Sequence, residues 1–469
     1  MIRSVVVALA VLVSLLTPSS SVAVDPAPAA AAAPEAGAKG LRERLEAIPG
    51  MRVERRSSSG ELVVFELSYR QPVNHRDPDQ GTFRQRLRLY HVGTGRPMVL
   101  HTTGYALPSP FLSEPAELLD ANQIDVEQRY FRPSRPQPTR WRFMTIRQAA
   151  ADHHRIVAAL RPIYGAAWIS TGASKGGMTS VYHRRFHPRD VAGTVAYVAP
   201  NDVNNRRDSY VEFIQRAGDR PACNRALRVV QRQLLLRRDG MLPLLRRLHE
   251  RRGLSVDDTF GSVNRAFEAA VLDTPFVFWQ YFGEQACGDV PGREASGRRL
   301  FRFVDQVAQW GFYSDNGIRP YETYFYQAAK QLGWPNVAEA QHLDGLLDYR
   351  QAGSAPASTP LSIRPEQFDA DAMDDIDAWV RGQGRRLLFV YGENDPWSAE
   401  PFRLGRGSVD SAVLVEPDGN HGASIRGLAA ADKERATEML IRWSGQQPGS
   451  VQADTHGLRR EVELRTQRQ

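Results

Sequence analysis

Cysteine is scarce in this chain, with only Cys223 and Cys287 among 469 residues. This scarcity excludes a disulfide-dense scaffold, and because the two are far apart in sequence it argues against a zinc knuckle. Lysine is rare next to arginine, and no long basic run is interleaved with aromatic residues. The net charge of +7 therefore indicates a solvated basic surface, and no nucleic-acid partner is expected. Beyond the N-terminus no segment is long and apolar enough to span a bilayer, so no stable membrane association is expected.

The N-terminus has the pattern of a secretory signal peptide over residues 1–23. Arg3 precedes a short apolar run from Val5 to Leu16, and small residues then predict cleavage after Ala23. An uncleaved anchor is the alternative. Residues 24–40 are rich in alanine and proline and predict a disordered leader. A secreted, extracellular protein would join Cys223 to Cys287 in one disulfide, with two buried free thiols as the alternative.

A serine between a buried strand and a helix is the main chemical signal. The apolar run 166–169 predicts a strand, residues 178–185 predict a helix, and Ser174 lies in the glycine-rich turn between them. A nucleophile elbow has this order, because small neighbours allow the strained turn and the close approach of helix and strand. A Gly-x-Ser-x-Gly pattern alone is common, so the flanking elements strengthen the interpretation.

The remaining pattern predicts an α/β core interrupted by a helical insertion. Strands are expected at 61–67, 82–92, 97–102, 123–131, 191–198, 386–391 and 412–415, with helices at 145–160 and 428–443. The core is predicted at 41–203 and 375–443, a helical cap rich in aromatic residues at 204–374, and a polar tail at 444–469. His153 and His154 are adjacent on one helix and point apart, so they cannot bind one metal together.

Three side chains that each follow a predicted core strand form a catalytic constellation. Ser174, Asp395 and His421 occur in the serine, acid, histidine order of α/β-hydrolases. His421 would act as general base and Asp395 would orient it, with Glu393 and Asp418 as rival acids. The backbone N–H groups of Lys175 and Tyr105 are the expected oxyanion donors. The Lys175 side chain is expected on the helix surface, with a contact to an acidic substrate as the alternative.

The motifs Gly172–Thr179, Val126–Phe131 and Tyr391–Ser398 resemble those of the secreted bacterial prolyl tri/tetrapeptidyl aminopeptidases. The likeness extends from about Leu62 to Trp443. It implies a serine exopeptidase that releases tri- or tetrapeptides from free N-termini, with proline favoured before the scissile bond. It also implies Ser174, Asp395 and His421 as the triad, and no cofactor or metal is expected. The resembled enzymes carry an aromatic residue or histidine where this chain has Gln128.

An aminopeptidase needs a carboxylate to meet the substrate ammonium, because a buried unpaired charge is costly. Glu284, Asp315 and Glu322 in the predicted cap are the candidates, and the sequence does not choose among them. A secreted esterase or lipase is the alternative function, since a triad alone does not select amide over ester. A non-catalytic protein on the same scaffold is a third hypothesis, against which the intact triad argues.

Overall fold

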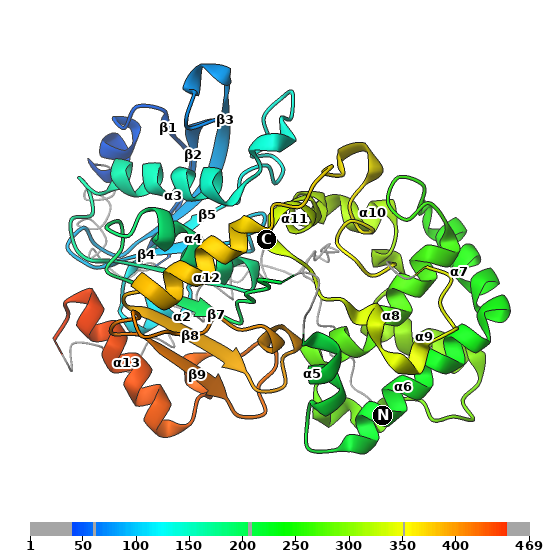
Figure 1. Ribbon diagram of the computed structural model, residues 1–469. Helices are drawn as coiled ribbons and strands as arrows, with labels where there is room; N and C mark the ends of the chain where they lie inside the picture. Colours follow the sequence, from blue (N-terminus) through cyan, green and yellow to red (C-terminus); the bar gives the residue numbers. More distant parts are fainter. Residues whose placement is uncertain (1–39, 60–61, 205–208, 350–351, 448–469) are drawn as a thin grey trace, which may run out of the picture.

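The computed structural model describes residues 40–59, 62–204, 209–349 and 352–447. The predicted signal peptide (1–23), nearly all of the predicted leader (24–40) and most of the predicted tail (444–469) lie outside these residues. Figure 1 shows a twisted sheet with flanking helices beside a body of helices coloured from green to yellow. None of the helices within the described ranges has the length and apolar character needed to cross a membrane.

The core is a nine-stranded mixed sheet with the order β1-β2-β3-β5-β4-β6-β7-β8-β9. The first three strands and β5 pair antiparallel, and the pairs from β5 through β9 are parallel. Strands β6, β7 and β8 are interior strands of the parallel part of the sheet and are almost wholly buried, as expected for parallel strands covered on both faces. The strands are β1 (Met51–Ser59), β2 (Leu62–Pro72), β3 (Thr82–His91), β4 (Met98–Thr102), β5 (Asn122–Val126), β6 (Trp168–Ala173), β7 (Gly193–Tyr197), β8 (Leu387–Gly392) and β9 (Ala412–Glu416).

Helices cover both faces of the sheet. On one face α3 (Ile146–Leu160), α4 (Lys175–Phe186) and α12 (Asp371–Gln383) pack together, and α2 (Glu114–Leu118) and α13 (Ala430–Ser444) cover the other. The insertion between β7 and β8 is helical, as predicted, and packs around its own apolar core. Its helices are α5 (Tyr210–Arg216), α6 (Pro221–Leu236), α7 (Arg238–Arg252), α8 (Val263–Tyr281), α9 (Gly297–Val307), α10 (Asp315–Ile318) and α11 (Glu322–Gln327).

The cap contains the one cystine bridge found among the described residues. Cys223 on α6 is bonded to Cys287 in the 3-10 helix η3 (Glu284–Asp289), across a sequence separation of 64. The prediction of a disulfide is therefore confirmed and the alternative of two free thiols is wrong. The bond ties the first long helix of the cap to the segment that follows α8, so it closes a loop containing three helices.

The structure adds one strand to those expected from the sequence and moves several boundaries, two of which bear on the site. Strand β1 was not predicted, because a polar edge strand such as Met51–Ser59 lacks the apolar alternation that signals a half-buried strand. The strand expected at 123–131 ends at Val126, where the chain leaves the sheet and the Gln128 N–H bonds to the Tyr105 carbonyl. The helix that returns from the cap begins at Asp371 and packs on α4, so the expected boundary at 374 falls inside it.

Candidate active site

Ser174 lies at the turn between β6 and α4, with φ of 54° and ψ of −128°. A non-glycine residue with positive φ is strained, and this is the conformation that lifts a nucleophile above a sheet. A Cβ on Gly172 would lie 2.6 Å from the Thr102 carbonyl oxygen, and one on Gly176 would lie 2.5 Å from the same atom. Both obstacles are backbone atoms, so these glycines are sterically required and the predicted elbow geometry is confirmed.

The acid and the histidine form a hydrogen-bonded pair. Asp395 follows β8 and is fully buried, and its Oδ2 lies 2.8 Å from His421 Nδ1. Its Oδ1 accepts the Trp397 N–H at 3.2 Å, which fixes the carboxylate plane. A carboxylate can only accept, so Nδ1 carries the proton of the neutral ring and Nε2 is left as the basic atom. The pairing gives Asp395 the geometry of a histidine-orienting residue.

One of the rival acids, Glu393, binds the backbone of the turn that carries the other, Asp418. Glu393 Oε2 accepts the Asp418 N–H at 3.0 Å, so this carboxylate holds the turn after β9. Within the described residues, Asp395 is the carboxylate that hydrogen-bonds to the His421 ring, and neither Glu393 nor Asp418 forms such a bond. The preference for Asp395 over these residues, made from the sequence, agrees with this geometry.

The cap reaches the histidine directly. The His421 N–H donates to the Gln280 carbonyl at 3.1 Å, near the end of α8. The Tyr281 ring meets the imidazole edge-on with centroids 6.2 Å apart, and the Trp397 ring lies 6.3 Å from it on the other loop. The imidazole is therefore held between core and cap, an environment that the separate sequence motifs did not reveal.

Tyr105 faces Ser174 with its side chain. Burial raises the pKa of the Tyr105 hydroxyl well above its ordinary value, while a hydrogen-bonding interaction with the Ser174 side chain opposes the shift. The phenol therefore stays protonated beside Ser174. The Tyr105 N–H, expected as an oxyanion donor, donates to Thr103 Oγ1 at 3.2 Å, so this amide is engaged within its own loop. The sequence motif indicates only this N–H and carries no signal for the phenol.

The Lys175 side chain is not on the surface, so that expectation is wrong. The residue is 2% exposed, and its Nζ donates to the Gly104 carbonyl at 2.6 Å. The ammonium lies 5.6 Å from the Tyr105 ring centroid and 5.9 Å from that of Phe131. Burial lowers the pKa of Lys175 to about 7. A helix position next to a glycine-rich turn carries no sequence signal for burial, because the loop that covers it comes from another strand.

The three carboxylate candidates have different surroundings. Asp315 accepts the Ser255 hydroxyl at 2.6 Å and the Thr259 N–H at 2.8 Å, so its carboxylate anchors neighbouring backbone of the cap. Glu284 pairs with Arg220 at 2.6 Å, and Glu322 pairs with Arg135.

Neighbours of Glu284 and of Glu322 contact different loops of the active site. The backbone beside Glu284 reaches the acid loop, because the Gly218 N–H donates to Asn394 Oδ1 at 2.8 Å. Glu322 follows Tyr321, whose ring centroid lies 6.3 Å from that of Tyr105. Both carboxylates therefore remain candidates for the substrate amine.

Gln128 is buried beside this loop without side-chain hydrogen bonds. The residue is 1% exposed, and within the described ranges neither its Oε1 nor its Nε2 has a partner. Its backbone N–H donates to the Tyr105 carbonyl at 2.8 Å. A buried amide without partners is costly, so an apolar side chain would fit this position at lower cost.

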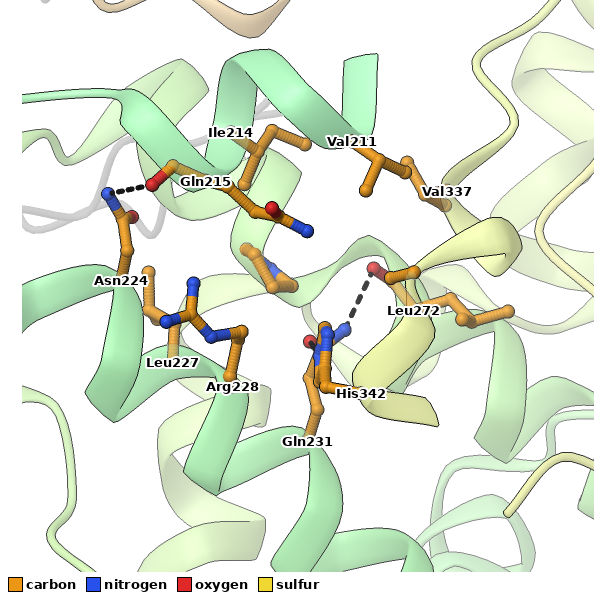
Figure 2. A pocket seen from close by; sticks show the side chains of 12 residues that line it. Val211, Ile214, Gln215, Asn224, Leu227, Arg228, Gln231, Leu272, Val337 and His342 are labelled. Atoms are coloured by element: carbon orange, nitrogen blue, oxygen red, sulfur yellow. Dashed lines mark hydrogen bonds between the residues drawn. The ribbon is translucent and has the colours of Figure 1, made fainter. Parts of the chain in front are cut away.

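A small hollow lies inside the cap, between α5, α6 and α8 (Figure 2). His342 Nε2 lies 2.7 Å from Gln231 Oε1 on one wall, and Leu272 and Val337 line the apolar side. It leaves about 30 Å³ for the centres of water-sized molecules. This is room for a few waters and not for a peptide.

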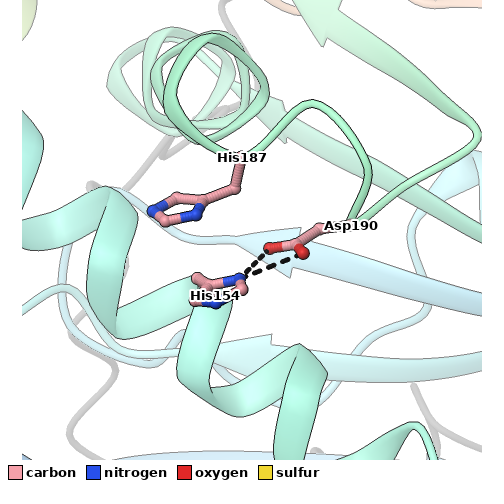
Figure 3. A group of neighbouring side chains, drawn as sticks. All are labelled: His154, His187 and Asp190. Carbon is pink, nitrogen blue, oxygen red and sulfur yellow. Dashed lines mark hydrogen bonds and ion pairs between the residues drawn. The ribbon is translucent and has the colours of Figure 1, made fainter.

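Figure 3 shows His154, His187 and Asp190, which lie close together at the junction of α3 and α4. The two rings stack with centroids 4.1 Å apart and planes 8° apart, and His154 Nδ1 lies 2.9 Å from an Asp190 oxygen. The lone pair of an imidazole nitrogen lies in the ring plane, so two stacked rings cannot both direct one at a single ion. Asp190 also pairs with His183 Nε2 at 2.8 Å, and the group ties the two helices together.

The parallel sheet, the strained serine turn and the buried Asp–His pair define an α/β-hydrolase. Solved structures with similar folds include the peroxisomal alpha-beta-hydrolase of Saccharomyces cerevisiae, at 12% identity and TM-score 0.35, covering 88% of this chain and 98% of that one. Another is the proline iminopeptidase of Mycobacterium smegmatis, at 14% identity and TM-score 0.34, covering 80% and 98%. At these scores the likeness is too distant to indicate an activity.

Similarity in amino-acid sequence, unlike the distant structural likeness, identifies the family. The PS-10 peptidase S37 family matches residues 33–466, and the prolyl tri/tetrapeptidyl aminopeptidase of Streptomyces mobaraensis is 44% identical over 419 residues. That alignment covers 88% of this chain and 87% of the relative. The chain belongs to the peptidase S37 family and is a serine peptidase, so the resemblance inferred from the motifs is confirmed. Membership also decides against the esterase or lipase and the non-catalytic protein.

Proposed function

We propose that the protein is a secreted aminopeptidase that releases tri- or tetrapeptides from free N-termini and prefers proline before the scissile bond. The observation that carries this proposal is the 2.8 Å hydrogen bond between His421 and buried Asp395. This pair follows the carboxyl ends of parallel strands, as the Ser174 elbow does. The relative at 44% identity, named as a prolyl tri/tetrapeptidyl aminopeptidase, supports the substrate class. The disulfide supports export, because such bonds persist in oxidising compartments.

The proposed reaction proceeds through an acyl-enzyme. Ser174 Oγ attacks the scissile carbonyl while His421 Nε2 takes its proton, and Asp395 stabilises the imidazolium that forms. The collapse of the tetrahedral intermediate breaks the C–N bond, and His421 returns the proton to the leaving amine. Water then repeats the sequence on the ester and releases the peptide. The Lys175 N–H at the start of α4 and the Tyr105 N–H would hold the oxyanion, the latter by exchanging its bond to Thr103.

The substrate amine is proposed to bind one of two cap carboxylates, Glu284 or Glu322. Each is already paired with an arginine, so the incoming ammonium would share or displace that partner. E284Q and E322Q variants, assayed on free and N-acetylated peptides, distinguish them. The variant that lacks the amine-binding carboxylate should lose the preference for free over acetylated N-termini, while D315N should keep that preference. If both amides retain the preference, the proposed amine site is wrong.

A substrate panel tests the activity. We expect a proline-ending tripeptide amide with a free amine to be cleaved, its acetylated form to be cleaved poorly, and a short-chain ester to be no better substrate. S174A should remove all turnover. Mass spectrometry of the products from a longer peptide reports tri- or tetrapeptide release, and sequencing of the exported protein tests cleavage after Ala23. Release of single residues would refute the proposed class.

A further inference from the structure

Lys175 is a buried cation that the proposed reaction does not use through its side chain. It directly follows Ser174, is 2% exposed, and has no carboxylate partner within the described residues. Among the described residues, its ammonium donates to the Gly104 carbonyl oxygen, 2.6 Å away, and lies over the rings of Tyr105 and Phe131. Burying an ammonium with so little compensation is costly, and such groups concentrate at functional sites.

The carbonyl that Lys175 binds belongs to the peptide unit between Gly104 and Tyr105. Gly104 O and the Tyr105 N–H are the two ends of one planar group, so holding the carbonyl fixes where the N–H points. A charge-assisted hydrogen bond to that carbonyl also polarises the group and strengthens the N–H as a donor. The same contact holds the residue whose phenol faces Ser174.

The loop is pressed against the elbow at this point. Gly104 has φ of +71°, and a Cβ on it would lie 2.5 Å from the Gly176 nitrogen. Thr102 Oγ1 donates to the Gly176 carbonyl at 2.8 Å, which fastens the end of β4 to the first turn of α4. Lys175 therefore adds a charged contact where the loop after β4 meets the first turn of α4.

We propose that the Lys175 ammonium is a positioning residue that sets the orientation of the 104–105 peptide and of the Tyr105 phenol relative to Ser174. The proposal rests on the proposed function for its oxyanion role. Because the charged ammonium donates to the Gly104 carbonyl more strongly than the neutral amine does, the contact weakens as the pH rises through the Lys175 pKa of about 7. Burial, with a smaller contribution from the Lys175 charge, lowers the pKa of His153 on α3 to about 3, so this neighbour stays neutral. Tyr105 stays protonated as well, because burial raises its pKa.

The test measures how fast a fluorophosphonate labels Ser174, because the phosphoryl oxygen occupies the oxyanion position and no peptide is needed. K175M should label about 10- to 100-fold more slowly than wild type, less than the loss of a direct donor. For peptide substrates kcat should fall while KM changes little. K175R should recover part of the rate, because its guanidinium also donates to a carbonyl. K433M is the matched control, since Lys433 Nζ donates to the Arg426 carbonyl at 3.3 Å on the exposed surface.

The pH profile separates positioning from a structural role. Wild-type labelling should decline as the pH rises above about 7, and in K175R this decline should move upward by more than one unit because arginine keeps its charge. Any of three results would overturn the proposal. The first is a wild-type labelling rate that stays constant up to pH 9, and the second is a K175R rate that declines at the same pH as the wild-type rate. The third is a labelling rate of folded K175M within twofold of wild type. If K175M does not fold, the first two measurements decide. If the wild-type protein is labelled at Ser174 but cleaves no peptide, the proposed aminopeptidase function is wrong. The labelling measurements then still decide whether Lys175 is a positioning residue.

Discussion

The substitution Asp395→Asn tests the acid most sharply, because it keeps the shape of the side chain and removes its charge. Asp395 Oδ1 accepts the Trp397 N–H and Oδ2 accepts from His421 Nδ1. An asparagine that keeps its oxygen on Trp397 presents its NH₂ to the imidazole. Nδ1 must then accept, so the ring proton moves to Nε2 and that atom can no longer take the proton of Ser174.

The magnitude follows from the same geometry. Opposite charges about 4 Å apart at an effective dielectric of about 20 interact by about 4 kcal/mol, which is about a 10³-fold loss of rate. The wrong tautomer adds to this, and an equivalent change in a serine protease costs about 10⁴-fold in kcat. We therefore expect kcat for D395N to fall by about 10³- to 10⁴-fold, with KM changed by less than about threefold.

The assay is steady-state hydrolysis of a fluorogenic proline-ending tripeptide, with the melting temperature measured to confirm folding. E393Q makes the same carboxylate-to-amide change two residues earlier in the same loop. The Glu393 carboxylate accepts a hydrogen bond from the Asp418 N–H and none from the His421 ring. It should keep kcat within about threefold. A D395N enzyme within tenfold of wild type, or an E393Q enzyme equally impaired, would refute this account of the acid.

Three further changes test the structure around the site. Replacing Cys223 and Cys287 by serine should lower the free energy of unfolding by about 4 kcal/mol, because the bond spans 64 residues; a loss below 1 kcal/mol in urea titrations would contradict this. G172A should destabilise by about 3 kcal/mol or more through its clash with backbone, whereas G165A, with no atom within 4 Å of the added Cβ, should be tolerated; equal melting temperatures would contradict this. Burial raises the pKa of Asp273 to about 7, above its unfolded value near 3.9, so the unfolded chain loses this proton first. Its contribution to stability therefore falls as the pH rises from about 4 to 7, and D273N should show a shallower decline of the melting temperature over that range; parallel declines would count against it.

The sequence by itself determined the elements that are local. The glycine pattern around Ser174 defines the elbow, because only residues without a Cβ fit between the end of β4 and the first turn of α4. The apolar runs of β6 and β8 indicate buried parallel strands, and the acid and histidine follow strand ends, where parallel topology gathers them. The helical character of the cap and the pairing of the two cysteines could also be predicted.

Only the tertiary structure decided what depends on contacts between distant segments. Burial of the Lys175 side chain results from the loop after β4 closing over α4, and nothing within the helix encodes it. The phenol of Tyr105, the satisfied carboxylate of Asp315 and the hold of α8 on His421 have the same origin. A sequence pattern reports the periodicity of one segment, whereas the burial and charge of a side chain depend on the segment packed against it.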